Sequence, residues 1–257
     1  KQLERHWLGA GGESEAIVIA LPIDMAPYMS VSAKGEPIGL FVDIWRKWAQ
    51  VTQQKIVFLT DNTQLSMQNL IDNKADVHAA YADDAVNANL FAHAHHIYSF
   101  FSKVYYPLAE RASPMVEGDL ANARLGILNS NPAKEALLKQ FDTVELVFFN
   151  SREAMIEASL SLDIDGFVAA QEITNVYLIK RSLQNRFNAV ADLSFESRVY
   201  SLVPKENKTL ISQIKSGFSQ VPISSLAEME NGWIEHSDSP YFAPAQSKVD
   251  LTRAQKH

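Results

Sequence analysis

Short apolar runs alternate along the chain with longer segments in which apolar residues recur at helical spacing. Residues 16–21 (AIVIAL) form a β-branched apolar run followed by prolines, which predicts a buried strand that ends in a turn. Residues 42–51 carry apolar side chains, Trp45 and Trp48 among them, at helical spacing. Residues 55–59 (KIVFL) are strand-like again, so the beginning of the chain predicts a β-α-β unit.

The same alternation continues over the rest of the chain. Strands are predicted at 75–81, 124–128, 144–149 and 164–169, and helices at 65–73, 132–141, 152–162, 210–218 and 226–234. Alternating strands and helices build mostly parallel sheets with helices on both faces. Two similar α/β halves therefore follow one another, and extended stretches at 105–109 and 198–203 are expected to pass between them. A chain that crosses twice makes a hinge.

These elements predict an α/β fold of two lobes, each a mixed sheet flanked by helices, joined by a hinge of two strands. We expect the first lobe to comprise residues 15–106 and 200–235, and the second lobe to comprise residues 107–199. Residues 236–257 are polar, contain prolines and lack sustained periodicity, which indicates a tail or linker.

Composition excludes several function classes. The chain has 23 basic and 30 acidic residues, a net charge of −7, and no basic run longer than two residues, which argues against nucleic-acid or anionic-membrane binding. It contains no cysteine, so disulfides and thiolate chemistry are absent. Its first residues lack the layout of a secretion signal, and we expect any such segment to lie outside this sequence.

Five short motifs occur in a particular order along the chain. They are APY followed by GLFVDI (26–28 and 39–44), LIDNKADV (70–77), FSKVYY (101–106), RLGILNSN (124–131) and IDGFVAA (164–170). In order and spacing they resemble the type II periplasmic solute-binding family, over roughly residues 15–235. That family contains the amino-acid-binding proteins of ABC importers and the Venus-flytrap sensor domains of bacterial receptors.

The resemblance implies that a ligand binds between the lobes, at the ends of the strands. Eight residues are predicted to contact it: Met25, Tyr28, Tyr81, Asp83, Asn129, Ser130, Asn131 and Gln171. The three residues before Pro132 stand at the start of a predicted helix, where capping alone would also explain them. A solvent-exposed loop would likewise account for Asp83.

The chain departs from the pattern of amino-acid-binding relatives at three positions. The arginine that holds the ligand carboxylate is absent from residues 83–91 (DDAVNANLF), the aspartate that pairs with the amino group falls at Ala170, and the stacking aromatic falls at Met25. With Asp83 near a strand end, we expect a cationic or neutral polar ligand rather than a free α-carboxylate.

The sequence contains few other signs of a catalytic, cofactor or metal site. The chain has no GxSxG, GxxxxGK, HExxH or GxGxxG motif, so no catalytic residue or cofactor is predicted. In AHAHH, His93 and His95 would share one side of a strand and so suggest a metal site, but we expect a polar loop there and no metal. The tryptophans Trp7, Trp45 and Trp48 are expected to be packing residues.

The sequence therefore favours a periplasmic sensor domain with no activity as an enzyme. It would close around a small polar molecule and signal through the membrane segments of a histidine kinase or diguanylate cyclase. One alternative is a free solute-binding protein that delivers its ligand to the permease of an ABC importer. A dehydratase-like enzyme on the same fold is a further alternative.

Overall fold

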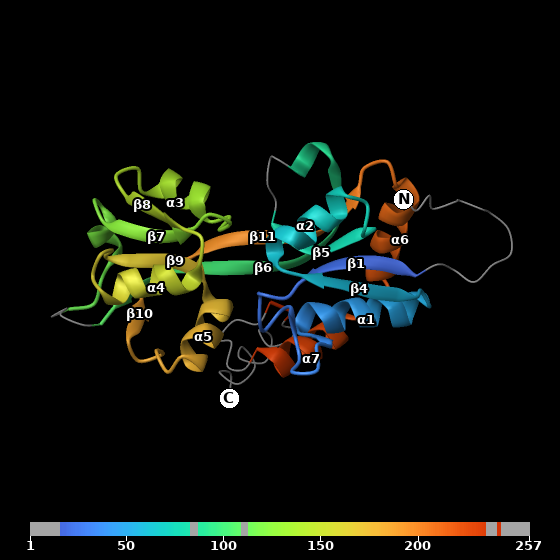
Figure 1. Ribbon diagram of the computed structural model, residues 1–257, viewed down its shortest axis with the longest axis horizontal. Helices are drawn as coiled ribbons and strands as arrows, with labels where there is room; N and C mark the ends of the chain where they lie inside the picture. Colours follow the sequence, from blue (N-terminus) through green and yellow to red (C-terminus); the bar gives the residue numbers. More distant parts are fainter. Residues whose placement is uncertain (1–15, 83–86, 109–112, 235–240, 243–257) are drawn as a thin grey trace, which may run out of the picture.

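The structure is a computed structural model that describes residues 16–82, 87–108, 113–234 and 241–242. Two groups of elements lie side by side, joined by two long strands that run through the middle of the molecule (Figure 1). The long strands are β6 (Phe91–Pro107) and β11 (Phe195–Pro204). The predicted two-lobed α/β architecture is thereby confirmed.

The first lobe contains the strands β1, β4 and β5 and the helices α1, α2, α6 and α7 (Figure 1). Its strand order is β4-β1-β5, and β5 pairs antiparallel with β11. A small hairpin, β2 (Ser30–Val31) and β3 (Pro37–Ile38), precedes α1. The other elements are β1 (Ile17–Pro22), α1 (Leu40–Thr52), β4 (Ile56–Asp61), α2 (Thr63–Ile71), β5 (Val77–Ala82), α6 (Lys208–Phe218) and α7 (Ile223–Trp233).

The second lobe contains the strands β7 to β10 and the helices α3 to α5 (Figure 1). Its strand order continues from β6 as β9-β7-β8, and β10 pairs with the end of β6. The elements are β7 (Arg124–Leu128), α3 (Lys134–Gln140), β8 (Glu145–Phe149), α4 (Arg152–Leu160), β9 (Gly166–Ala170), α5 (Gln171–Lys180) and β10 (Phe187–Ala189). Short 3-10 turns lie at Asn87–Asn89 and Glu117–Leu120.

Strand pairing runs without a break from one lobe to the other because β6 belongs to both. Its first part pairs with β11, and its last part pairs with β9 and β10. Along β6 the buried side chains change from the first lobe's core at Phe100 to the second lobe's core at Val104. Along β11 the change falls between Phe195 and Val199. The lobe limits expected from the sequence stay a prediction.

Local sequence explains where several elements begin. The side chain of Asn62 accepts a hydrogen bond from the Leu65 amide at the start of α2, and Ser151 does the same for Ala154 in α4. Gly39 precedes α1 with φ of 127° and lies so close to the Tyr28 carbonyl that a Cβ would collide with it. Glycine is therefore required at this chain reversal.

The expectation of a polar loop at AHAHH is wrong. These residues belong to β6, whose pairing with β11 shifts register opposite Ala94 and again opposite Ile97. Because of the first irregularity, His93 stacks on Tyr200 at 4.2 Å whereas His95 stacks on Phe218 at 4.1 Å. The two imidazoles therefore lie against different rings. Within the described ranges no group of three or more His, Cys, Asp or Glu residues could hold a metal ion.

Trp45 and Trp48 are fully buried, as expected, whereas Trp7 lies outside the described residues. Of the expected tail, only Tyr241 and Phe242 are described, and both rings pack against Tyr98. In the part of the chain that the structure describes, no helix is both long and apolar enough to cross a bilayer.

Candidate functional site

The two lobes meet at the ends of β1 and β9. Ile173, in the first turn of α5, belongs to the same buried cluster as Tyr28, and Met25 and Ala170 pack against that cluster. Ile173 and Ala170 come from the second lobe, and Met25 and Tyr28 from the first. We call this region the lobe interface, and it lies where ligands bind in open α/β folds.

The predicted first-lobe contacts lie in two different places. Met25 is half-buried and bridges to Met29 in the turn after β1. Tyr28 is only 1% exposed and is surrounded by aromatic rings, with Phe100 at 4.6 Å. Tyr81 is half-buried and its ring meets His78 edge-on at 5.1 Å, in a cluster with residues of α2. The structure therefore brings Met25 and Tyr28 together but not Tyr81. Asp83 lies outside the described residues.

The predicted second-lobe contacts surround the ends of β7 and β9. Asn129 and Ser130 are exposed, and the Asn129 side chain donates to Asn150 Oδ1 at 2.6 Å. Asn131 donates to the Val168 carbonyl at 3.0 Å and accepts from the Ala133 amide at 2.9 Å, so its side chain holds the sheet and the following turn together. Gln171 is half-buried at the start of α5.

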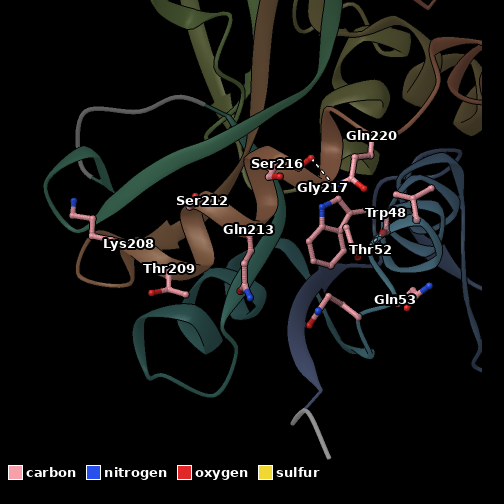
Figure 2. A pocket seen from close by; sticks show the side chains of 12 residues that line it. Trp48, Thr52, Gln53, Lys208, Thr209, Ser212, Gln213, Ser216, Gly217 and Gln220 are labelled. Carbon is pink, nitrogen blue, oxygen red and sulfur yellow. Dashed lines mark hydrogen bonds between the residues drawn. The ribbon is translucent and has the colours of Figure 1, made fainter. Parts of the chain in front are cut away.

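Two pockets lie outside the lobe interface as defined above. One of about 310 Å³ is in the second lobe, beside α5, and is lined by polar residues, among them Gln171, Lys103 and Asn175, and by apolar ones such as Leu178 and Phe187. Figure 2 shows the other, of about 690 Å³, between α1 and α6 on the first lobe. Its side chains come from those helices, as Gln213 does, and from the turns that follow each of them, as Gln53 and Gln220 do, and not from the predicted contacts.

Arg152 and Asp24 carry opposite charges on different lobes. Asp24 follows β1 and accepts a hydrogen bond of 2.6 Å from the Thr63 hydroxyl at the start of α2. Arg152 is the first residue of α4, directly after β8. Burial lowers the pKa of the Arg152 guanidinium, and the Asp24 carboxylate opposes this effect. The charges of the two lobes therefore act on each other.

Glu172 adds a carboxylate to the same interface. It lies in the first turn of α5 and is half-buried, and its side chain makes no hydrogen bond or ion pair to any described residue. Burial raises its pKa, and the nearby charge of Glu230 adds to the effect. Glu172 in turn raises the pKa of Tyr28, although burial of that phenol is the larger cause. A half-buried carboxylate with no partner in the described part of the chain favours a cationic partner.

A sequence model matches residues 17–236, and it describes the bacterial extracellular solute-binding proteins, family 3. The chain belongs to this family. The match confirms the resemblance that the motifs indicated. A search of curated proteins gave no significant match.

Solved structures share the fold of this family 3 chain. The periplasmic VFT2 domain of BvgS from Bordetella pertussis has a TM-score of 0.72 and 12% identity, over 85% of this chain and 92% of that one. A histidine kinase sensor domain with similarity to periplasmic binding proteins gives 0.72 and 17%, over 86% and 97%. An ancestral arginine-binding protein bound to glutamine gives 0.70 and 14%, over 88% and 100%.

Three charged residues were not predicted from the sequence of this family 3 chain: Arg152, Glu172 and Glu230. One signal was available for Arg152. It is a cation in the first turn of a helix, where the macrodipole disfavours positive charge. In the sequence, Glu230 resembles an ordinary exposed position of an amphipathic helix, and Glu172 lies where no helix was predicted. Only the tertiary structure shows that Glu230 is 1% exposed.

Proposed function

We propose that the chain is an extracytoplasmic, periplasmic sensor domain that closes around a small polar molecule. It would signal through membrane segments of a receptor of the histidine kinase or diguanylate cyclase type. The observation that carries the proposal is the packing of Met25 and Tyr28 of the first lobe with Ala170 and Ile173 of the second lobe, in two lobes that are linked through β6 and β11. Membership of the solute-binding family and the sensor domains that share the fold support it.

The ligand in this proposal carries a cationic group. Glu172 has no partner among the described residues and lies at the lobe interface, so an ammonium group there would gain a charge-assisted hydrogen bond. The residues predicted from the sequence remain the proposed surroundings of the ligand: Met25, Tyr28, Tyr81, Asp83, Asn129, Ser130, Asn131 and Gln171. Tyr28 would contact it only after the lobes open, because its ring is buried here.

Delivery of the ligand to an ABC importer is the second candidate function. One observation favours it: the ancestral arginine-binding protein bound to glutamine is covered over 100% of its length. The same two-lobed fold thus suffices to bind an amino acid in that protein. No catalytic step enters either candidate.

Binding is tested by thermal denaturation in the presence of amines, amino acids, sugars and organic acids. A ligand that binds only the folded state raises the apparent stability by RT ln(1 + [L]/Kd). Small-angle scattering should then show a smaller radius of gyration with the ligand, as the lobes close. If no compound of the panel raises the melting temperature, the solute-binding proposal fails.

The full-length gene separates the sensor from the importer protein. A hydrophobic stretch of about 20 residues after residue 257 is expected for a receptor, because that length spans the hydrocarbon core of a bilayer. A stop codon directly after residue 257, with no membrane span encoded upstream either, would favour the importer protein.

A further inference from the structure

Arg152 occupies a position that disfavours its charge. It is the first residue of α4, and the side chain of Ser151 caps this helix by accepting a hydrogen bond from the Ala154 amide at 3.2 Å. The first turn of a helix carries a partial positive charge, so a guanidinium there is repelled. The helix start alone gives no reason for an arginine at this position.

The surroundings of Arg152 do not satisfy it either. Its Nε atom is buried without a hydrogen-bond acceptor, and the side chain forms no ion pair with any residue in the described ranges. Its guanidinium lies over the Tyr177 ring, 5.6 Å from the centroid. Burying this N–H group without an acceptor costs free energy, and an anion bound to it would offset the cost.

Arg181 shows what a structural arginine looks like at the same ring. It also lies over Tyr177, at 5.4 Å, but it is exposed and donates to Glu153 Oε1 at 2.7 Å. Two arginines therefore share one aromatic contact, and only Arg181 has an acidic partner in the described part of the chain. An arginine that binds an anionic ligand must be free of such an acidic partner, and Arg152 meets this condition among the described residues.

We propose that Arg152 binds an anionic group of the ligand, and that the ligand is a carboxylate-bearing solute. The inference rests on the proposed function and deepens it. The arginine expected in residues 83–91 of the first lobe is absent from the sequence, whereas the second lobe has a guanidinium at Arg152, directly after β8. Together with Glu172, which would receive a cation, it assigns a ligand with both charges, and this proposal differs from the expectation that a carboxylate is disfavoured.

Asp24 limits the directions from which a ligand carboxylate can approach Arg152. Its carboxylate is held by Thr63, through the hydroxyl at 2.6 Å and the amide at 3.3 Å, and it acts on Arg152 without forming an ion pair. A ligand carboxylate bound to Arg152 would be repelled by Asp24. We therefore expect the carboxylate to approach Arg152 from the side away from Asp24, as a bidentate pair.

The test measures binding of the common L-amino acids and succinate to the unmodified protein and to Arg152→Gln, by thermal shift and calorimetry. Each amino acid that binds is paired with its decarboxylated amine, for example L-arginine with agmatine. We expect at least one carboxylate compound to bind, and to bind more tightly than the amine that lacks its carboxylate. Arg152→Gln should weaken the binding of this compound about 10- to 100-fold. Arg152→Lys should recover part of the loss, because it restores the charge without the fork geometry.

Arg181→Gln is the control, since it removes the other arginine from the Tyr177 ring and should leave binding unchanged. Circular dichroism and the melting temperature of the ligand-free Arg152→Gln protein show whether it is folded, and we expect no loss of stability. The inference is overturned if no carboxylate compound binds, if the amines bind equally well, or if Arg152→Gln binds normally. The proposed function fails only if sugars, amines and neutral solutes also have no effect.

Discussion

The hydroxyl of Tyr98 donates a hydrogen bond of 2.6 Å to the carboxylate of Glu230, which is 1% exposed. The same carboxylate accepts from the Tyr241 and Phe242 amides, each at 2.8 Å. Tyr98 lies on the long strand β6, Glu230 on α7, and the two amides in the chain beyond it. One buried acid therefore ties the strand that joins the lobes to the end of the described chain.

Glu230→Gln should release Tyr241 and Phe242 from this position. An amide replaces one of the two oxygens that accept these hydrogen bonds, and its N–H₂ group would face a donor. Loss of hydrogen bonds to a charged acceptor costs about 1.5–3 kcal/mol. We expect that decrease in the free energy of unfolding, together with faster hydrogen exchange at both amides. Glu228→Gln, at an exposed position of the same helix, should change neither measurement. Equal exchange in the two variants would contradict this role of Glu230.

Gly217→Ala should destabilise the contact between α1 and α6. A Cβ at this position would overlap the Trp48 indole nitrogen and lie 2.6 Å from Thr52 Cγ2. Overpacking of this kind costs about 1–3 kcal/mol, to be measured by denaturant unfolding. Gly232→Ala in α7 is the matched control, because nothing lies within 4 Å of its Cβ position. It should leave stability unchanged or raise it by up to about 1 kcal/mol. A Gly217→Ala protein as stable as the unmodified one would contradict the packing argument.

The buried His78 and the half-buried His95 should make the protein less stable in mild acid. Burial lowers the pKa of His78 from 6.5 to about 3, and burial followed by the charge of His96 lowers that of His95 to about 4. In both cases the unfolded state binds the proton more readily. The stability they contribute is therefore complete above pH 6.5 and is lost progressively as the pH falls through the folded pKa.

At pH 5 the protein should have lost about 2 kcal/mol of stability through His78 relative to pH 7, at about 1.4 kcal/mol for each pH unit below the unfolded pKa, and less through His95, whose partial exposure to solvent weakens the effect. Unfolding curves at both pH values measure the change. His78→Gln retains a group that can bond to the Ser66 hydroxyl, which lies 3.0 Å from His78 Nε2. This variant should reduce the difference between the two pH values by about 2 kcal/mol. An unchanged difference would mean that other groups control the acid response.

Periodicity predicted most of the fold because most elements bury one face only. The strand at 124–128 was predicted with both limits correct, and it pairs as β7 with β8 and β9. Helix α5 was missed because it is apolar on more than one side. Ile173 packs into the first lobe's core, while Leu178 packs into the second lobe's core. A helix between two lobes has no single apolar stripe for a pattern to reveal.

The first part of β6 was missed for a different reason. His93, His95 and His96 hide its apolar alternation, and two register shifts against β11 interrupt the period of two. The roles of Arg152 and Glu172 were missed because the sequence does not show whether a charged side chain has a partner of opposite charge. That depends on which residues the fold brings next to it. Arg152 and Arg181 are both arginines near the ends of helices in the sequence, and only the structure shows that Glu153 pairs with Arg181.

Glu172→Gln separates the cost of a half-buried carboxylate from its proposed role in binding. Burial raises the pKa of Glu172, and Glu230 adds to this, so folding disfavours its ionised form. The folded pKa lies above the unfolded one, and stability is therefore lost as the pH rises through the folded pKa. Removing the charge should raise the melting temperature of the ligand-free protein at pH 7 and have little effect near pH 4.

The same variant should bind a ligand that carries an ammonium group about 10- to 100-fold more weakly, because a charge-assisted hydrogen bond is lost. Glu135→Gln is the control. Glu135 also lies in the first turn of a helix, α3, but it is exposed. Replacing it should slightly lower stability through the helix dipole and leave binding unchanged. A Glu172→Gln protein that is less stable at pH 7, yet binds as tightly as the unmodified chain, would mean that Glu172 supports the start of α5 and takes no part in binding.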